Sequence, residues 1–408
     1  MNRSRVLYVF RHTLGAPLPR LHGLDQLRAL SARGRRFSVI SFEPRDRTPT
    51  EEIQYEAERR ALADAGIEHV ALPQLRSRWF EIPMGALAIL RLVLLRRVRT
   101  VHARSHVPAI MAALARAVSP LRLVFDMRGL FVDEYVLEGA LRPGSAKLAF
   151  ARALERWLLS VSDVVVVVSE RFREHLQSAP GYAGRVDPAK VRLIPNRAAL
   201  DRFEDAVHAR AATRESRGYE ESVVGVFAGA ASPWHRLDLT AELMRRVMDE
   251  RPDVRFLVAV YPSTEGATRI ARECGLPEER TEILTAPTDE IPYLFAASDF
   301  GLMLVDDDVS KQVCAPVKFA EYLASGLPVV AGGGMGDACD WIDDEGLGIL
   351  VDPDDVAASS RRVLDFLRSD DFISRRSSER VRSFAAARMD MSDTVDEYED
   401  IYRSLDSR

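Results

Sequence analysis

Residues 310–331 have the sequence SKQVCAPVKFAEYLASGLPVVA, which predicts a helix followed directly by a strand. Pro316 suits the first turn of that helix, Gly326 suits its end, and residues 328–331 begin the strand. The N-terminus of such a helix offers free N–H groups and a partial positive charge, so it can bind phosphate. Lys318 lies in the first turn, where a cation opposes the helix dipole unless an anionic ligand is present. The spacing of Lys318 and Glu321 is equally compatible with an ordinary solvated ion pair.

The alternation of helix and strand extends in both directions from this segment. The continuous apolar run at Val164–Val168 is typical of a strand buried on both faces of a parallel sheet. We therefore expect an α/β protein with two Rossmann-like, doubly wound parallel-sheet domains facing each other across a cleft. The expected strands cover residues 6–10, 37–42, 69–72, 100–103, 121–126, 164–168 and 191–194, then 223–227, 255–260, 282–284, 300–304, 328–331 and 348–351.

The domain boundaries follow from changes in composition along the chain. The N-terminal domain is expected over residues 1–198, and the C-terminal domain over residues 221–380. Residues 199–220 are polar and poor in β-branched residues, which favours a linker or a surface helix, and we assign them as a linker. Residues 381–408 are expected to form a helical segment that could pack back on the N-terminal domain.

Composition and cysteine usage narrow the class of protein. The chain has 408 residues, of which 47% are hydrophobic and 29% charged, so a disordered or fibrous protein is excluded. Its three cysteines form neither a disulfide framework nor a metal-site spacing, which fits a reducing compartment. No signal peptide is expected, and the longest apolar run, Ile82–Leu95, has 14 residues, fewer than the roughly 20 that span a bilayer. The sequence predicts a cytoplasmic protein, at the inner face of the plasma membrane if it contacts lipid.

The charge of the chain is divided unequally between its halves. Residues 1–200 contain 32 basic and 19 acidic residues, a net charge of +13, whereas the remainder contains 24 and 42, a net charge of −18. The stretch Leu87–Arg99 mixes aliphatic residues with four arginines, which favours peripheral contact with an anionic membrane. The alternative is that these arginines only solvate a packed helix. No nucleic-acid partner is expected.

Several motifs resemble those of GT-B glycosyltransferases, in particular glycosyltransferase family 4. Glu321 and the following residues through Ala331 match the family's donor motif, a helix with a glutamate followed by A-x-G-x-P-V-V-A. Residues 191–196, VRLIPN, and 163–169, DVVVVVS, match two further motifs in the expected order, and residues 229–236, GAASPWHR, resemble the family's donor-domain loop. The resemblance implies that the N-terminal domain binds the acceptor and that the C-terminal domain binds a nucleotide sugar.

The same resemblance implies roles for individual residues. Glu321 would bind the ribose hydroxyls, Arg236 and Lys318 would neutralise the diphosphate, and Gly229 and Gly333 would line the donor site. Fixed cations at the diphosphate would stabilise the transition state without a metal, so neither metal nor cofactor is expected. The chain departs from the family pattern in two places. Val313 stands where the family's first glutamate is common, and Ala230 stands where an arginine is common.

The N-terminal half contributes a second group of candidates. Residues 101–109, VHARSHVPA, resemble the family's H-x-H turn and make His106 the candidate catalytic residue, although it could be only a neighbour of a helix start. Asp126 and Arg128, in a D-x-R turn, would line the acceptor site or simply pair with each other. Gly15 lies in the first loop, where a glycine permits close approach to a phosphate.

These observations predict a retaining, metal-independent glycosyltransferase of the hexosyltransferase type (EC 2.4), acting in surface polysaccharide or glycolipid synthesis. Its partners would be a nucleoside diphosphate sugar and a glycan or lipid-linked acceptor. Two alternatives remain open: a nucleotide-sugar 2-epimerase of the same architecture, and a catalytically inactive GT-B-like partner subunit. The triplet Asp306–Asp308 is interpreted as a solvated loop, because three adjacent carboxylates cannot easily converge on one ion.

Overall fold

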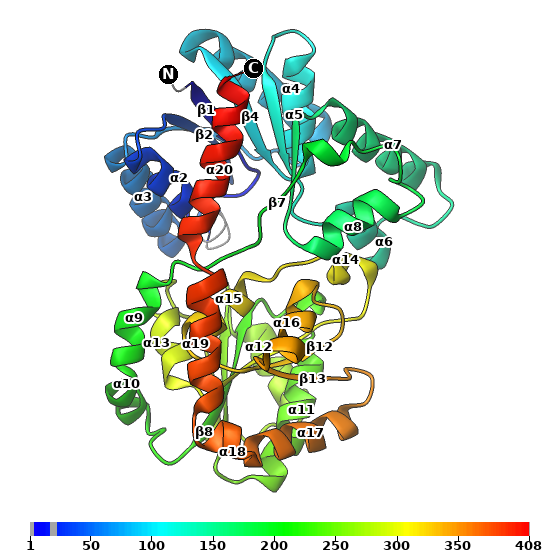
Figure 1. The fold of residues 1–408 in the computed structure, drawn as a ribbon. Helices are drawn as coiled ribbons and strands as arrows, with labels where there is room; N and C mark the ends of the chain where they lie inside the picture. Colours follow the sequence, from blue (N-terminus) through cyan, green and yellow to red (C-terminus); the bar gives the residue numbers. More distant parts are fainter. Residues whose placement is uncertain (1–3, 17–22, 408) are drawn as a thin grey trace. The chain divides into compact units, whose positions relative to one another are not determined.

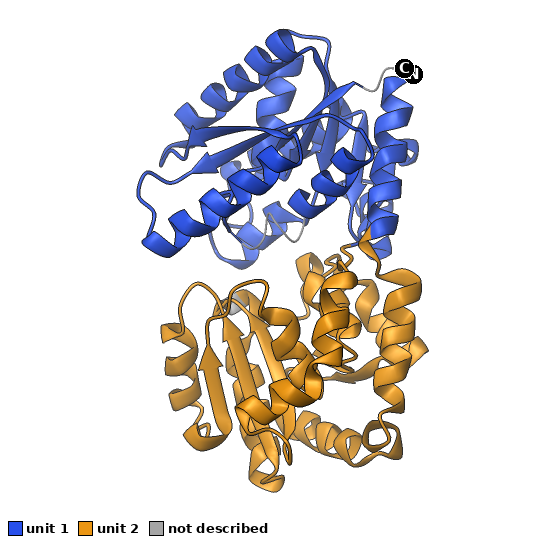
Figure 2. Ribbon diagram, turned by 90° about the vertical axis from the view of Figure 1, so that its left-hand side faces the viewer, with its two compact units in different colours: residues 1–195, 392–408 blue, residues 196–391 orange. Residues whose placement is uncertain are grey.

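The computed structural model describes residues 4–16 and 23–407 and divides the chain into two compact units (Figures 1 and 2). Unit 1 contains residues 1–195 and 392–408, and unit 2 contains residues 196–391. Each unit is built on one parallel sheet covered by helices, so the predicted α/β class with two doubly wound sheets is confirmed.

Unit 1 has a seven-stranded sheet with the order β3-β2-β1-β4-β5-β6-β7. Its strands are hydrophobic because helices cover both faces, and the four valines of β6 are all buried. The strands are β1 (Arg5–Val9), β2 (Phe37–Glu43), β3 (Glu68–Pro73), β4 (Val98–Arg104), β5 (Arg122–Asp126), β6 (Val164–Val167) and β7 (Val191–Leu193). The helices are α2 (Asp25–Ala32), α3 (Pro49–Asp64), α4 (Arg78–Arg96), α5 (His106–Arg116), α6 (Phe131–Leu137), α7 (Ala146–Val161) and α8 (Glu170–Ser178).

The C-terminal helix α20 (Met391–Asp406) packs on the unit 1 sheet, as Figure 1 shows beside β1. Its tyrosines and aliphatic residues join the core formed by β1, β2 and α2. Arg35 is 1% exposed and donates to Glu399 of α20 over 2.7 Å, so the helix is held by a buried ion pair as well as by apolar packing.

Unit 2 has a six-stranded sheet with the order β10-β9-β8-β11-β12-β13. Its strands are β8 (Val223–Gly229), β9 (Val254–Val260), β10 (Thr281–Leu284), β11 (Phe300–Leu304), β12 (Val329–Gly332) and β13 (Gly348–Val351). Its helices are α9 (Asp201–His208), α10 (Arg210–Arg217), α11 (Leu237–Glu250), α12 (Glu265–Glu273), α13 (Ile291–Ala297), α14 (Val309–Gln312), α15 (Val317–Ala324), α16 (Asp337–Glu345), α17 (Val356–Arg368), α18 (Asp370–Ile373) and α19 (Arg376–Arg388).

The segment assigned as a linker, with a surface helix as the alternative, is helical and belongs to unit 2. Residues 201–217 form α9 and α10, which belong to unit 2. Arg210 and Arg214 of α10 both bind Asp299, and Arg214 donates to the Ala297 carbonyl over 2.7 Å at the end of α13. The polar residues of this segment are therefore ion-paired to a helix C-terminus, where cations are favourable, rather than solvated between domains.

Candidate functional site

Helix α15 is held against the unit 2 sheet by Tyr322, the neighbour of Glu321. The Tyr322 hydroxyl accepts a hydrogen bond from Ala228 N (3.0 Å) near the carboxyl end of β8. Its ring packs over Gly301 of β11, where a Cβ would come within 2.5 Å of the ring. Tyr322 therefore anchors the helix on its sheet side, and Glu321 lies one turn into a helix that begins at the carboxyl edge of the sheet.

Glu321 is a buried carboxylate with a cation beside it. Only 3% of its surface is exposed, and its Oε2 lies 2.6 Å from Nζ of Lys318. A buried charge of this kind requires compensation, which Lys318 supplies. The Lys318–Glu321 ion pair, which the spacing allowed as the alternative to ligand binding, is present, but Glu321 is buried and not solvated.

A second lysine, Lys311 of α14, points to the same region. It is 2% exposed, and its Nζ lies 4.0 Å from the centroid of the Trp234 ring, close enough for a cation–π interaction. Burial, followed by the charges of Lys311 and Lys318, lowers the pKa of His235 to about 4. Both ammonium groups therefore act on the loop at residues 230–236, and His235 is neutral at physiological pH.

The loop after β8 is folded tightly around this histidine. Gly229 ends the strand, and a Cβ there would lie 3.2 Å from the His235 ring. The Ser232 hydroxyl and His235 Nδ1 are 3.0 Å apart, and residues Pro233–His235 form a single 3₁₀ turn. Gly229 thus permits the close approach of His235 to the end of the strand. The contact of Gly229 with the donor remains a prediction.

Arg236 is engaged by two carboxylates. Its guanidinium binds Asp306, and it lies 3.0 Å from Asp238 Oδ2. The hydrogen bonds that Arg236 donates, first to Asp238 and then to Asp306, raise its pKa further above its ordinary value. The charges of Lys311 and Lys318 contribute to the lowered pKa of His235, and the structure places Lys311 over the Trp234 ring in this loop.

The turn after β12 is explained by packing within unit 2. Gly333 has a φ of 76°, and a Cβ there would lie 2.2 Å from the Val305 carbonyl oxygen. That approach requires glycine whether or not a ligand binds. The predicted role of Gly333 in the donor site therefore stays a prediction.

The aspartate triplet does not form a metal centre. Asp306 binds Arg236, Asp307 accepts from Gln312 Nε2 over 2.8 Å, and Asp308 accepts from Ser310 N over 2.8 Å and so caps α14. The three carboxylates have three different partners. Among the residues that the structure describes, no cluster of three or more His, Cys, Asp or Glu side chains is arranged to bind a metal.

In unit 1, His106 opens α5 just beyond the carboxyl end of β4. Its Nε2 lies 2.8 Å from Oε1 of Glu155, and its ring meets Phe125 and Phe131 edge-on. Burial favours a higher pKa for Glu155, but hydrogen bonds from His106 and Tyr182 outweigh it. The pKa of Glu155 is therefore lowered, and this carboxylate is ionised. The Nδ1 atom of His106 is buried and has no hydrogen-bond partner in the described part of the chain.

The remaining unit 1 candidates have structural contacts of their own. Asp126, the last residue of β5, is fully buried, and its Oδ1 lies 3.5 Å from Nη1 of Arg128, which fits the structural pairing left open by the sequence. At Gly15, a Cβ would lie 2.6 Å from Tyr55 N of α3. The close approach that this glycine permits is therefore to a helix backbone, and its contact with an acceptor phosphate remains a prediction.

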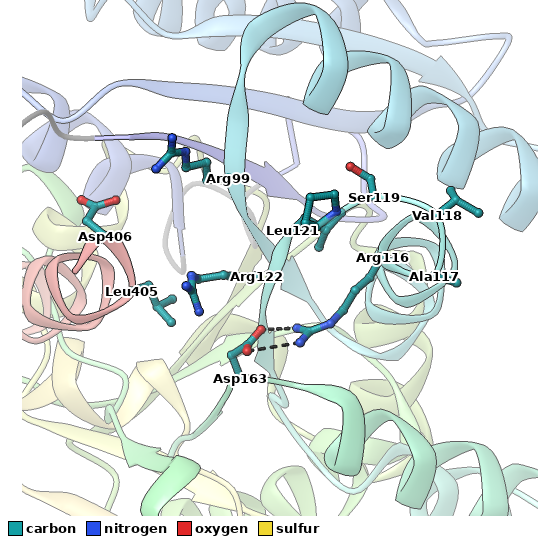
Figure 3. A pocket seen from close by; sticks show the side chains of 11 residues that line it. Arg99, Arg116, Ala117, Val118, Ser119, Leu121, Arg122, Asp163, Leu405 and Asp406 are labelled. Carbon is teal, nitrogen blue, oxygen red and sulfur yellow. Dashed lines mark hydrogen bonds and ion pairs between the residues drawn. The ribbon is translucent and has the colours of Figure 1, made fainter. Parts of the chain in front are cut away.

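A pocket of about 740 Å³ lies elsewhere in unit 1 (Figure 3). Its lining comes from the starts of β4 and β5, from the residues before β6 and from the end of α20, and Arg116 pairs with Asp163 across it. Ligands of doubly wound sheets bind at the carboxyl ends of the strands, whereas this pocket lies at the amino ends. It is therefore set apart from the candidate site.

The sequence analysis did not assign Lys311 or His235 to the site. The signal that could have found Lys311 is the scarcity of lysine, because only four of the 56 basic residues are lysines and two of them act on this loop. No comparable signal singled out His235.

Comparison with known proteins gives the family context. Residues 22–202 match Glycosyltransferase Family 4, and residues 222–369 match Glycosyl transferases group 1. A GDP-mannose-dependent alpha-(1-6)-phosphatidylinositol monomannoside mannosyltransferase of Mycobacterium tuberculosis is 28% identical over 228 residues, which are 55% of this chain and 57% of that protein. A D-inositol 3-phosphate glycosyltransferase of Streptomyces scabiei is 27% identical over 202 residues, 46% of this chain and 43% of that protein. The chain thus spans about half the length of the curated relatives that it matches.

Solved structures show the same fold over the whole chain. A glycosyltransferase from Rickettsia africae superposes with a TM-score of 0.75 at 17% identity and covers 99% of both chains. Anabaena HepE in complex with UDP and glucose superposes with a TM-score of 0.72 at 16% identity, covering 99% of this chain and 100% of that one. The two family matches therefore support a glycosyltransferase resembling family 4, and the solved structures show that its two parallel sheets form the GT-B fold.

Proposed function

We propose that this glycosyltransferase moves a sugar from a nucleoside diphosphate sugar to a glycan or lipid-linked acceptor, with retention at the anomeric carbon. The observation that carries the proposal is the buried carboxylate of Glu321 paired with Lys318 in the first turn of α15, with Lys311 over the Trp234 ring in the loop after β8. Surface polysaccharide or glycolipid synthesis is the setting that we favour, because the mycobacterial relative is named for a phosphatidylinositol mannoside acceptor.

The chemistry follows from where charge develops. When the sugar leaves, negative charge grows on the diphosphate, and fixed cations near it lower the barrier without reorganisation. Lys311, Lys318 and the N-terminus of α15 would supply that positive charge, with Arg236 at the edge of the loop. Glu321 would accept hydrogen bonds from the ribose hydroxyls, which orients the nucleotide.

The acceptor proton needs a base, and the leaving diphosphate itself can serve. The donor-site residues identified above include no side-chain nucleophile, so we favour a front-face displacement in which the diphosphate takes the proton. Val313, at the position of the family's first glutamate, is buried, and its apolar side chain offers no hydrogen bond to the sugar. His106 would form a hydrogen bond to the donor sugar or the acceptor through Nδ1, because its Nε2 is already engaged by Glu155.

The direct test is consumption of nucleotide sugars by the full-length protein. GDP-mannose is the first candidate, since the mycobacterial relative is named for it, and UDP-glucose is the comparison. We expect transfer to an acceptor, or slow donor hydrolysis, with release of nucleoside diphosphate measured by chromatography. Release of a free epimer would support the 2-epimerase alternative, and a folded protein without turnover on any donor would support an inactive partner subunit.

Turnover is expected to survive removal of divalent metals. The two lysines and the helix terminus would already neutralise the diphosphate, so the rate in EDTA should stay within about twofold of the untreated rate. Assays with EDTA, and then with added magnesium or manganese, measure this. A rate that collapses in EDTA and returns with either ion would contradict the proposed metal-free mechanism.

We also propose that unit 1 contacts an anionic membrane through α4. No helix in the described residues is long and apolar enough to cross a bilayer. However, α4 exposes Trp79, Phe80, Leu87, Leu94 and Leu95, each at least 65% accessible, next to several arginines. Such a face would bring the enzyme to a lipid-linked acceptor at the inner surface of the membrane.

A further inference from the structure

The carboxyl edge of the unit 1 sheet holds a cluster of charged residues that the proposed mechanism does not use. Arg104 is the last residue of β4, and the strand register pairs it with Asp126, the last residue of β5. Arg128 follows two residues after Asp126. Arg104 is 6% exposed and Asp126 is fully buried, so both charges are withdrawn from water.

Arg104 differs from the other buried arginine of this unit in having no partner. Its guanidinium forms no hydrogen bond or ion pair within residues 4–16 and 23–407, and its Nε is buried without a partner. Arg35, by comparison, is 1% exposed and binds both Glu399 and Asp406. A buried guanidinium N–H without a partner is unfavourable, and Nε of Arg104 is such a group.

Asp126 does not supply the missing partner. Its Oδ1 faces Arg128 at 3.5 Å, and its Oδ2 faces His102 Nε2 at 3.5 Å without a hydrogen bond. Burial, and then repulsion from Arg128, lower the pKa of Arg104, which is the signature of a cation with too little negative charge around it. The carboxylate of Asp126 is thus engaged by Arg128 and not by Arg104.

Local geometry adds to the positive character of this edge. Helix α5 starts at His106, two residues after Arg104, and runs for 11 residues without a side-chain cap at its N-terminus. Between them, Ser105 has a φ of 76°, a backbone conformation that is costly for a residue with a side chain. Such a strained conformation persists only where the surrounding structure fixes it. Here the strained residue connects Arg104 to the N-terminus of α5, which is the positive end of the helix dipole.

We propose that Arg104 binds a phosphate group of the acceptor at the carboxyl edge of the unit 1 sheet. The planar guanidinium matches two phosphate oxygens at once, and a bound phosphate would neutralise the excess positive charge. The assignment of the phosphate to the acceptor rests on the proposed function, whereas binding of phosphate at Arg104 does not. The phosphate can belong to a soluble phosphomonoester or to a lipid headgroup.

The test uses the full-length protein with its nucleotide site saturated by the diphosphate that it binds. Thermal unfolding is followed with methyl phosphate, with acetate and with phosphatidic acid vesicles, for the wild type, Arg104→Gln and Arg60→Gln. Arg60 is an exposed arginine of α3 and serves as the matched control. The variant Arg104→Lys keeps the charge without the fork, in case Arg104→Gln does not fold.

We expect Arg104→Gln to unfold at a higher temperature than the wild type before methyl phosphate, acetate or vesicles are added, because an unpaired buried charge is removed. Its apparent affinity for methyl phosphate should fall at least tenfold and that of Arg104→Lys at least threefold, while Arg60→Gln behaves as the wild type. A vesicle response that depends on Arg104 assigns the phosphate to a lipid, and a response to methyl phosphate alone assigns it to a soluble acceptor.

Two results would overturn the proposal. One is an unchanged methyl phosphate response in Arg104→Gln or, if that variant is unfolded, in Arg104→Lys. The other is an equal response of the wild type to acetate, which would remove the preference for phosphate. Nucleotide affinity is measured separately on the same variants, so a chain that binds methyl phosphate through Arg104 but consumes no nucleotide sugar would refute the proposed function and leave this site standing.

Discussion

Glu321→Ala is expected to weaken binding of the nucleoside diphosphate by about 10- to 150-fold while leaving the fold intact. The loss corresponds to roughly 1.5–3 kcal/mol, the contribution of a hydrogen bond to a charged group. In this site the carboxylate is 3% exposed, so water cannot replace it easily. Isothermal titration calorimetry with GDP and UDP measures the change.

Inorganic pyrophosphate separates the role of Glu321 from that of the lysines. Glu321→Ala frees Lys318, whose Nζ lies 2.6 Å from the carboxylate, so pyrophosphate affinity should be unchanged or higher. Glu242→Ala is the control, because Glu242 lies on α11 of the same unit and forms an exposed pair with Arg246. Equal affinity of wild type and Glu321→Ala for both nucleotides would remove Glu321 from the nucleotide site.

The elements that were predicted correctly are those with a local cause. The helix of residues 317–324 and the strand that follows it are specified by Pro316, by Gly326 and by a β-branched run, all close together in the sequence. The valine run at 164–167 is buried because a parallel strand is covered on both faces, which its composition alone indicates. The Lys318–Glu321 pair also has a local cause, because the two residues are three positions apart on one helix.

What could not be predicted depends on contacts between distant segments. Lys311 reaches the ring of Trp234, 77 positions earlier in the chain, and no periodicity reports such a contact. The guanidinium of Arg236 binds Asp306, 70 residues away, which the sequence pattern does not indicate. Arg210 and Arg214 lie in the segment assigned as a linker, but both form ion pairs with Asp299. Pattern identifies elements, whereas the partner of a charge is set by tertiary structure.

Arg104 illustrates the same limit from the other side. In the sequence it is one of 52 arginines and carries no signal of its own. Arg104 stands out because it lacks an ion-pair partner in the described residues. The strand register sets it beside Asp126, but that carboxylate faces Arg128 and His102. An unpaired buried charge can be recognised only once the positions of all its neighbours are known.

Membrane contact through α4 leads to the second large expected effect. Phe80, Pro83, Leu87, Arg91 and Leu94 recur at helical spacing and are all exposed, whereas Gly85, on the opposite face, packs against Met111 of α5. This outward stripe is mainly apolar, so insertion should contribute more than charge. Arg96, which the sequence suggested as a lipid contact, instead lies 2.8 Å from Glu68 and is partly neutralised.

Leu87→Ser/Leu94→Ser is expected to lower recovery on phosphatidylserine-containing vesicles at least tenfold. Full burial of one leucine contributes about 1.5–3 kcal/mol, so even partial insertion of two accounts for a change of this size. The control is Ile53→Ser/Ile373→Ser, which removes two hydrophobic side chains of comparable exposure, 72% and 64% against 67% for each leucine. Flotation of the full-length protein at low and high salt separates electrostatic attraction from apolar insertion. Salt screens the arginines, over about 8 Å at physiological ionic strength, and leaves apolar insertion intact. Equal recovery of the leucine variant and the wild type, with circular dichroism showing both folded, would exclude α4 as the membrane contact. Retention of most wild-type binding in high salt, together with its loss in the leucine variant, would identify apolar insertion as the dominant force.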